Sequence, residues 1–131
     1  MTADESVVRG LYEARARGDL EAAAAFIAED VEWHEPYEYL GSLKGRNQVM
    51  AAIRQSVEET HGTFKLDLHD VLASDDHVVA LVRFSAERNG HRMSGKEVGI
   101  FHIENGLIRE VWFATDEDVE AVSEFMRGEH L

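Results

Sequence analysis

Residues 77–115 read HVVALVRFSAERNGHRMSGKEVGIFHIENGLIREVWFAT, which is three runs of alternating apolar and polar residues separated twice by Asn-Gly. The pairs Asn89–Gly90 and Asn105–Gly106 are strong hairpin signals, because both residue types tolerate the positive φ angles of a type I′ turn. Upstream, TFKLDLHDVLA at residues 63–73 alternates in the same way and is followed by Ser-Asp-Asp. The sequence therefore predicts a meander of four long antiparallel strands.

Two helices are predicted at the N-terminus. Thr2 and Glu5 have the spacing of a capping box, and apolar residues then recur at helical intervals until Gly18. Asp19 is placed to cap a second, alanine-rich helix running to about Ala28. Almost no residues separate the two segments, so we expect them to pack as a helical hairpin.

Between these helices and the meander, a short strand and a third helix are predicted. Residues 31–35 alternate, with Val31, Trp33 and Glu35 on one face, and Pro36 ends the strand. A third helix of about fourteen residues follows the LKG segment and carries apolar side chains at four-residue steps. After the meander, Thr115 and Asp118 form a second capping-box pattern that begins a short C-terminal helix.

This order predicts an α+β fold in one domain spanning residues 1–131: three N-terminal helices packed on a cone-shaped, curved antiparallel sheet, with a short C-terminal helix. A sheet that curves strongly and is closed by helices encloses a space between them. The interior of the cone is therefore the predicted small-molecule site.

Charge and composition narrow the classes of partner. The formal charge is −13, from 26 acidic and 13 basic residues, so the average field repels nucleic acid and anionic membrane surfaces. The chain has no cysteine, which removes disulfides and thiolate chemistry and agrees with a cytoplasmic location. The N-terminus lacks the bases of a signal peptide, and no apolar run reaches the length of a membrane span.

The chain resembles the nuclear transport factor two-like (NTF2-like) superfamily, and within it the SnoaL-like and ketosteroid-isomerase-like proteins. The resemblance rests on RARGDLEAAAAFIAEDVEWHEP, on LKGRNQVMAAI and on the meander ending in HIENGLIREVWFA. It implies a cystatin-like roll, no cofactor and a homodimer formed through the outer sheet face. It also implies a site for a hydrophobic small molecule, on which such proteins act as isomerases, cyclases or dehydratases.

The resemblance marks Glu35 as the candidate general base, because family isomerases carry a carboxylate directly before a proline at this strand end. The oxyanion donors of those isomerases fall on Leu11 and Gly99, which cannot donate from a side chain, and Tyr12 is one position away from the first. The residues alone leave two alternatives for Glu35. It either faces an apolar interior, which would raise its pKa, or sits solvated at the mouth of the site.

Six further residues are predicted to line the pocket: Trp33, Tyr37, Tyr39, Glu97, Gly99 and Phe101. Tyr37 and Tyr39 follow Pro36, where tyrosines either donate to a ligand or cover the core rim. Glu97 shares a strand face with Phe101 and is either a second pocket carboxyl or a partner in an ion pair on the outer surface.

No metal site is predicted. His34 and His102 are expected on the outer sheet face, and the histidines show no pair at ligand spacing. Three functions therefore remain open from sequence: a cofactor-independent acid–base enzyme using Glu35, a non-catalytic carrier of a small ligand, and a dimeric regulatory protein with a vestigial pocket.

Overall fold

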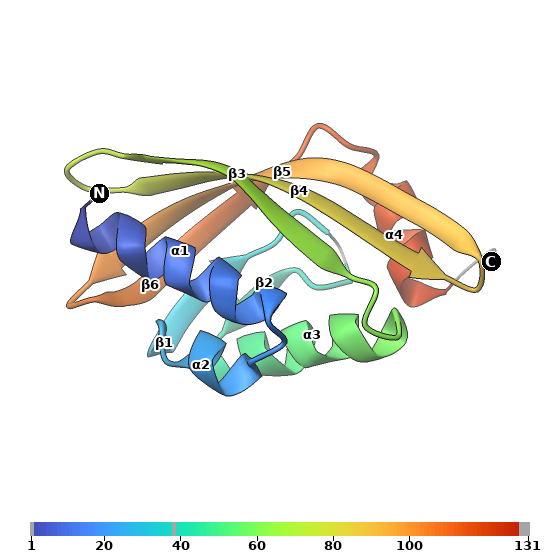
Figure 1. The fold of residues 1–131 in the computed structure, drawn as a ribbon, viewed down its shortest axis with the longest axis horizontal. Coiled ribbons are helices and arrows are strands. Elements are labelled where there is room, and N and C mark those ends of the chain that lie inside the picture. Colours follow the sequence, from blue (N-terminus) through green and yellow to red (C-terminus); the bar gives the residue numbers. More distant parts are fainter. Residues whose placement is uncertain (1, 38, 129–131) are drawn as a thin grey trace.

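A computed structural model describes residues 2–37 and 39–128. Its helices are α1 (Ala3–Ala16), α2 (Leu20–Ala24), α3 (Arg46–Glu59) and α4 (Val119–Arg127). Its strands are β1 (Ile27–His34), β2 (Ser42–Lys44), β3 (Lys65–Ala73), β4 (Val78–Arg88), β5 (His91–Glu104) and β6 (Leu107–Ala114). The predicted α+β class is confirmed (Figure 1).

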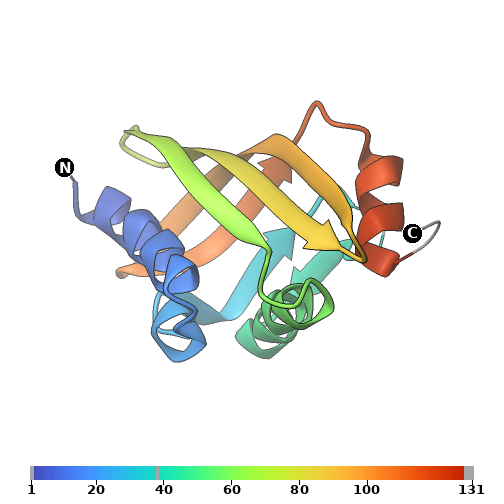
Figure 2. The same ribbon diagram turned by 45° about the vertical axis from the view of Figure 1, so that its right-hand side comes forward.

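The six strands form one curved sheet in the order β2-β1-β6-β5-β4-β3. Neighbouring strands are antiparallel except β1 and β6, which run parallel, so the early strand joins the meander at its far side. Both Asn-Gly turns have positive φ angles, as the hairpin pattern predicted. Figures 1 and 2 show α1, α2 and α3 on one side of the sheet and α4 at one end.

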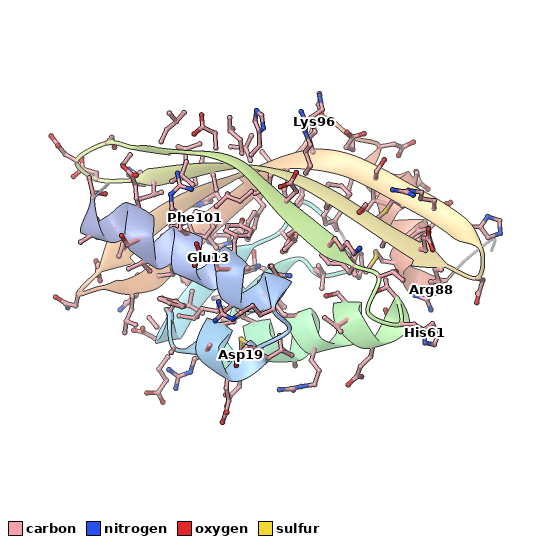
Figure 3. The ribbon with its side chains drawn as sticks, in the orientation of Figure 1. Glu13, Asp19, His61, Arg88, Lys96 and Phe101 are labelled. Atoms are coloured by element: carbon pink, nitrogen blue, oxygen red, sulfur yellow. The ribbon has the colours of Figure 1, made fainter. Side chains whose placement is uncertain are left out.

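The core lies between the sheet and α1, α2 and α3. On β4, Val78, Ala80 and Val82 are buried in this core, Phe84 is buried in a second cluster with residues of α4, and the alternate residues of the strand are half-buried or exposed. Because side chains alternate along a strand, each strand contributes one inner face to the core and one outer face. The inner row of β5 includes Phe101, which Figure 3 shows between the sheet and α1, whereas Lys96 projects from the other side.

Helix caps account for several element boundaries. The Thr2 hydroxyl accepts a hydrogen bond from the Glu5 backbone N–H, and the Asp19 carboxylate accepts one from the Ala22 N–H, as the sequence predicted. At α4 the N-cap is Asp118, which accepts from the Ala121 N–H. Thr115, predicted to begin the capping box, instead donates to the Lys96 carbonyl on β5.

The second helix is shorter than predicted, and the first strand is longer. Helix α2 ends at Ala24, and Ile27 is already paired with Ile108 of β6. The backbone N–H of Ile108 also donates to the Phe26 carbonyl at 2.8 Å. Sheet pairing at this point overrides the helix propensity of the alanine run.

A further strand, β2, lies between β1 and α3, where no strand was predicted. It pairs antiparallel with β1, for example Trp33 with Leu43. In the part of the chain that the structure describes, no helix is both long and apolar enough to cross a membrane.

Candidate active site

An internal cavity lies between the sheet, α3 and α4, next to the end of β1. Its walls are mostly apolar, with side chains from β2, α3, β3, β4, β6 and α4. Of the described residues, three with ionisable acidic or basic side chains line it: Arg15 from α1, Glu35 just after β1, and Glu97 from β5. The combination of apolar walls with a few converging polar groups is typical of a small-molecule site.

Glu35 is directed into the cavity because β1 alternates. Val31 and Trp33 precede it at two-residue steps and are both buried. The Trp33 indole N–H donates a hydrogen bond of 2.9 Å to Glu35 Oε1, which fixes one carboxyl oxygen. Burial raises the pKa of Glu35, while the hydrogen bond from Trp33 and the charge of Arg15 act against that rise.

Glu97 reaches the same cavity from the inner row of β5, across from Val82 of β4. Burial is the main cause that raises its pKa to about 8, and repulsion by Glu35 adds to it, while Arg15 opposes both. The two carboxyls are therefore close enough for each to affect the ionisation of the other. The sequence left open whether Glu97 lies in the pocket or in an ion pair on the outer surface. In the structure its side chain lines the cavity.

Arg15 is the functional residue that the sequence analysis missed. It lies beside both carboxyls, and burial lowers its pKa while Tyr12, Glu97 and Glu35 raise it. A guanidinium stays protonated in proteins, so Arg15 brings a fixed positive charge to the cavity. Its helical spacing could have identified Arg15 as facing inward, because it follows buried Leu11 by four positions and buried Val8 by seven.

Tyr12, one position away from the family's donor position, lies near Glu97 without lining the cavity. Its ring is buried and packs edge-on against Phe101. Burial, followed by the negative charge of Glu97, raises its pKa well above the ordinary value. Leu11, at the family's donor position, is fully buried in the core and offers no donor.

Tyr37 and Tyr39 both line the cavity, with ring centroids 6.1 Å apart. Burial is the main cause that raises the pKa of each. The Tyr37 hydroxyl is fully covered, makes no hydrogen bond of good geometry to the described residues and lies beside Thr115. Tyr37 therefore contributes its ring to the wall of the cavity.

Gly99 and Phe101 do not line the cavity, in contrast to the prediction. Phe101 is fully buried in the core and packs against Tyr12 and Phe113. A Cβ at Gly99 would lie 2.7 Å from Phe101 Cε1 and 3.0 Å from Phe113 Cε1. The missing side chain makes room for two aromatic rings and leaves no space for a ligand.

His34 and His102 lie on the outer sheet face. His34 Nε2 is 2.8 Å from Glu110 Oε2, its Nδ1 is 3.0 Å from the Ser42 hydroxyl, and His102 is bonded to Glu104. Within the described residues, Glu32, His34 and Glu110 form a group with the spacing of metal ligands, their ligand atoms within 4.8 Å of one another. This group is on the face of the sheet opposite the cavity, so it could not serve the chemistry of Glu35.

Residues 8–111 match the SnoaL-like domain, and the chain belongs to this family of the NTF2-like superfamily. An uncharacterised protein of Mycobacterium tuberculosis is 32% identical over 109 residues, which cover 81% of this chain and 83% of the relative.

Two solved structures extend the comparison. The structure of Bal32a, from a soil-derived mobile gene cassette, is 33% identical with a TM-score of 0.88 and covers 95% of this chain and 97% of its own. An NTF2-like protein of unknown function from Burkholderia pseudomallei is 26% identical with a TM-score of 0.83, over 96% of this chain and 98% of its own.

Proposed function

We propose that this protein binds a small, largely apolar molecule with a carbonyl-type oxygen and moves a proton on it without a cofactor. The reaction would be an isomerisation, a cyclisation or a dehydration, with Glu35 as the general base. The observation that carries the proposal is the pairing of two carboxyls of raised pKa with a half-buried arginine in the wall of an apolar cavity. Such pairs are typical of acid–base sites.

The two carboxyls have different environments, which assigns them different roles. Glu35 receives the indole hydrogen bond of Trp33, which favours its ionised form. Burial and repulsion by Glu35 keep the proton on Glu97, whose pKa of about 8 lies above neutrality. We therefore assign the role of base to Glu35, whose ionised form is favoured by the Trp33 hydrogen bond and the Arg15 charge, and the role of acid to Glu97.

In the proposed step, Glu35 takes a proton from the carbon next to the carbonyl, and the electron pair of that C–H bond moves towards oxygen. Protonated Glu97 donates a hydrogen bond to this oxygen, where negative charge develops. Return of the proton to a different carbon isomerises the molecule, and loss of a β-hydroxyl instead dehydrates it. Glu97 thereby supplies the donor that Leu11 and Gly99 cannot.

The test is deuterium incorporation from heavy water into a panel of ketones, followed by proton NMR, with wild type and Glu35→Gln. We expect the variant to lose about 100-fold or more of the exchange rate, as removal of a general base typically causes. Glu32→Gln is the control, because Glu32 precedes Glu35 by three positions but is exposed.

An unchanged exchange rate in Glu35→Gln would exclude Glu35 as the base. If wild type binds the ketones without exchanging their protons, and Glu35→Gln binds them equally well, the protein is a carrier and not an enzyme.

We also propose that two copies of the chain pair through the outer sheet face. Leu72, Ile100 and Trp112 have exposed fractions of 55%, 37% and 39%. They lie in one row across the outer side of the sheet, in which Val79 of β4 stands between Leu72 and Ile100. Large apolar side chains that gather on one exposed face favour association. In such a dimer the two cavities would lie on the far sides of the paired sheets.

A further inference from the structure

The cavity around Glu35 and Glu97 is too small to enclose a whole substrate. Its free volume is about 60 Å³, which is room for a few water molecules at roughly 10–15 Å³ each. Sites that enclose ligands usually measure roughly 300–1,000 Å³. Only the reacting end of a molecule would fit beside the two carboxyls, so the remainder must lie elsewhere.

A second, larger hollow of about 950 Å³ adjoins this cavity. The two share Arg15, Ile53, Phe64, Leu66 and Phe84 in their walls. The larger hollow is lined by the end of α1, by α3 and by β3, and also by residues of β4 and β5. Strand β3 is the edge strand of the sheet (Figure 2). A molecule whose reacting end occupies the cavity would therefore extend past Arg15 into this groove.

The charge of the groove is opposite to that of the whole protein. Its walls contain five of the 13 basic residues of the chain, namely Arg15, Arg17, Lys65, Arg83 and Lys96. Among the residues that the structure describes, the acidic side chains in these walls are Asp67 and Glu117. A basic groove in a protein of formal charge −13 attracts an anionic group locally while the remaining surface repels it.

The basic side chains of the groove are available to a ligand. Arg17, Lys65, Arg83 and Lys96 are all exposed, and none forms an ion pair with another of the described residues. Figure 3 shows Lys96 on the outer side of the sheet, so the cations nearest the cavity are those at the end of α1 and the start of β3. These are Arg17, two positions after Arg15, and Lys65, directly before Leu66, where Arg15 and Leu66 line both hollows.

We infer that the ligand of this protein is an elongated amphipathic anion. Its apolar, reacting end enters the cavity, and its carboxylate, sulfonate or phosphate group lies in the groove against Arg17 and Lys65. This inference rests on the proposed function for the identity of the reacting end, but the anion site itself depends only on the groove.

Two fluorescent probes that share one ring system test the anion site. We would titrate wild type at low salt with 1-anilinonaphthalene-8-sulfonate and with N-phenyl-1-naphthylamine, which lacks the sulfonate. The sulfonate should bind at least about fivefold more tightly. Arg17→Gln and Lys65→Gln should each weaken its binding about two- to fivefold, the size expected for an exposed charge pair, and leave the neutral probe unaffected.

Arg54→Gln is the matched control, because Arg54 is an exposed cation on α3 that does not line the groove. Equal affinities for the two probes would overturn the inference, and so would groove variants that behave like Arg54→Gln. Glu35→Gln separates this inference from the proposed function. It should abolish proton exchange and leave the ratio of the two probe affinities unchanged, so either property can fail without the other.

Discussion

At the scale of single residues, the proposed chemistry of the cavity depends on three ionisable groups. Arg15 carries a fixed positive charge, and the carboxyls of Glu35 and Glu97 are proposed to hold one proton between them. The positive charge of Arg15 opposes the rise in the pKa of Glu97, and it also opposes the rise in the pKa of Glu35. Without it, two carboxyls would face an apolar cavity with no counter-charge. The hydrogen bond from Trp33 and the charge of Arg15 both favour the ionised form of Glu35 against the effect of burial.

We therefore expect Arg15→Met, which keeps the length of the side chain and removes the charge, to raise the pKa of both carboxyls. The pKa of Glu97 should move above its value of about 8. Carbon-13 NMR titration of the glutamate carboxyls would measure it, with Arg17→Met as a control at an exposed position of the same segment. A Glu97 titration that does not change would show that Arg15 points away from the carboxyls.

A second residue-scale prediction concerns stability. Because the pKa of Glu97 is about 8 when folded and ordinarily 4.5, the folded protein holds a proton that the unfolded chain releases between these values. The contribution of Glu97 to stability is therefore greatest below pH 4.5 and is lost as the pH rises towards 8. Between pH 5 and pH 9, wild type should lose more unfolding free energy than Glu97→Gln.

Urea unfolding at the two pH values would measure this difference. Glu13→Gln, at an exposed position on α1, removes the same charge and controls for the change in net charge. If wild type and Glu97→Gln change in parallel between pH 5 and pH 9, the Glu97 carboxyl is not held in its neutral form by the fold.

At the scale of elements, the packing around β5 depends on the absence of a side chain at Gly99, where a Cβ would meet the rings of Phe101 and Phe113. Phe101 cannot move away from an added Cβ, because its ring is fully buried and packs against Tyr12 and Phe113. Gly99→Ala should therefore destabilise the protein by about 1–3 kcal/mol, the usual cost of overpacking a core.

Urea unfolding would measure this cost, with Ser94→Ala at an exposed position of the same strand as the control. Equal stability of Gly99→Ala and wild type would mean that the two rings rearrange freely. Gly99 was predicted to line the pocket from its position in the family, but in the structure it makes room for two aromatic rings. Strand alternation predicts which face a residue lies on, and it does not predict which side chains the residue contacts there.

The elements themselves could be predicted well from sequence, because the signals that define them are local. Alternation and the Asn-Gly turns gave all four long strands within two residues of their ends. The errors came where distant parts of the chain meet. Ile27 was predicted as helical because its pairing with Ile108 cannot be read from neighbouring residues, and β2 is too short to show alternation.

The residues of the site were also predictable only where a local pattern marks them. Alternation grouped Glu35 with Trp33 and Glu97 with Phe101, but it left open whether these faces look inward. Arg15 was missed because a charged residue in a helix usually faces solvent, and only its spacing from Val8 and Leu11 marks it as inward. No local pattern gives the volume of a cavity, since that depends on the gaps left between packed elements.

At the scale of the whole molecule, the curved sheet separates two different surfaces. Its inner face builds the cavity, and its outer face carries Trp112 next to Ile100 on the neighbouring strand. The proposed dimer would bury these side chains, which otherwise remain in water. The energetic gain comes from apolar area removed from water, so one charge at the centre of the face should be enough to prevent pairing.

We therefore expect wild type to be a dimer at micromolar concentration and Trp112→Glu to be a monomer, as measured by light scattering. Val57→Glu is the matched control, because Val57 on α3 has the same exposed fraction as Ile100, 37%, but lies on the helical side of the sheet. It should remain a dimer. A monomeric wild type, or a Trp112→Glu variant that still pairs, would show that the outer sheet face is not the interface.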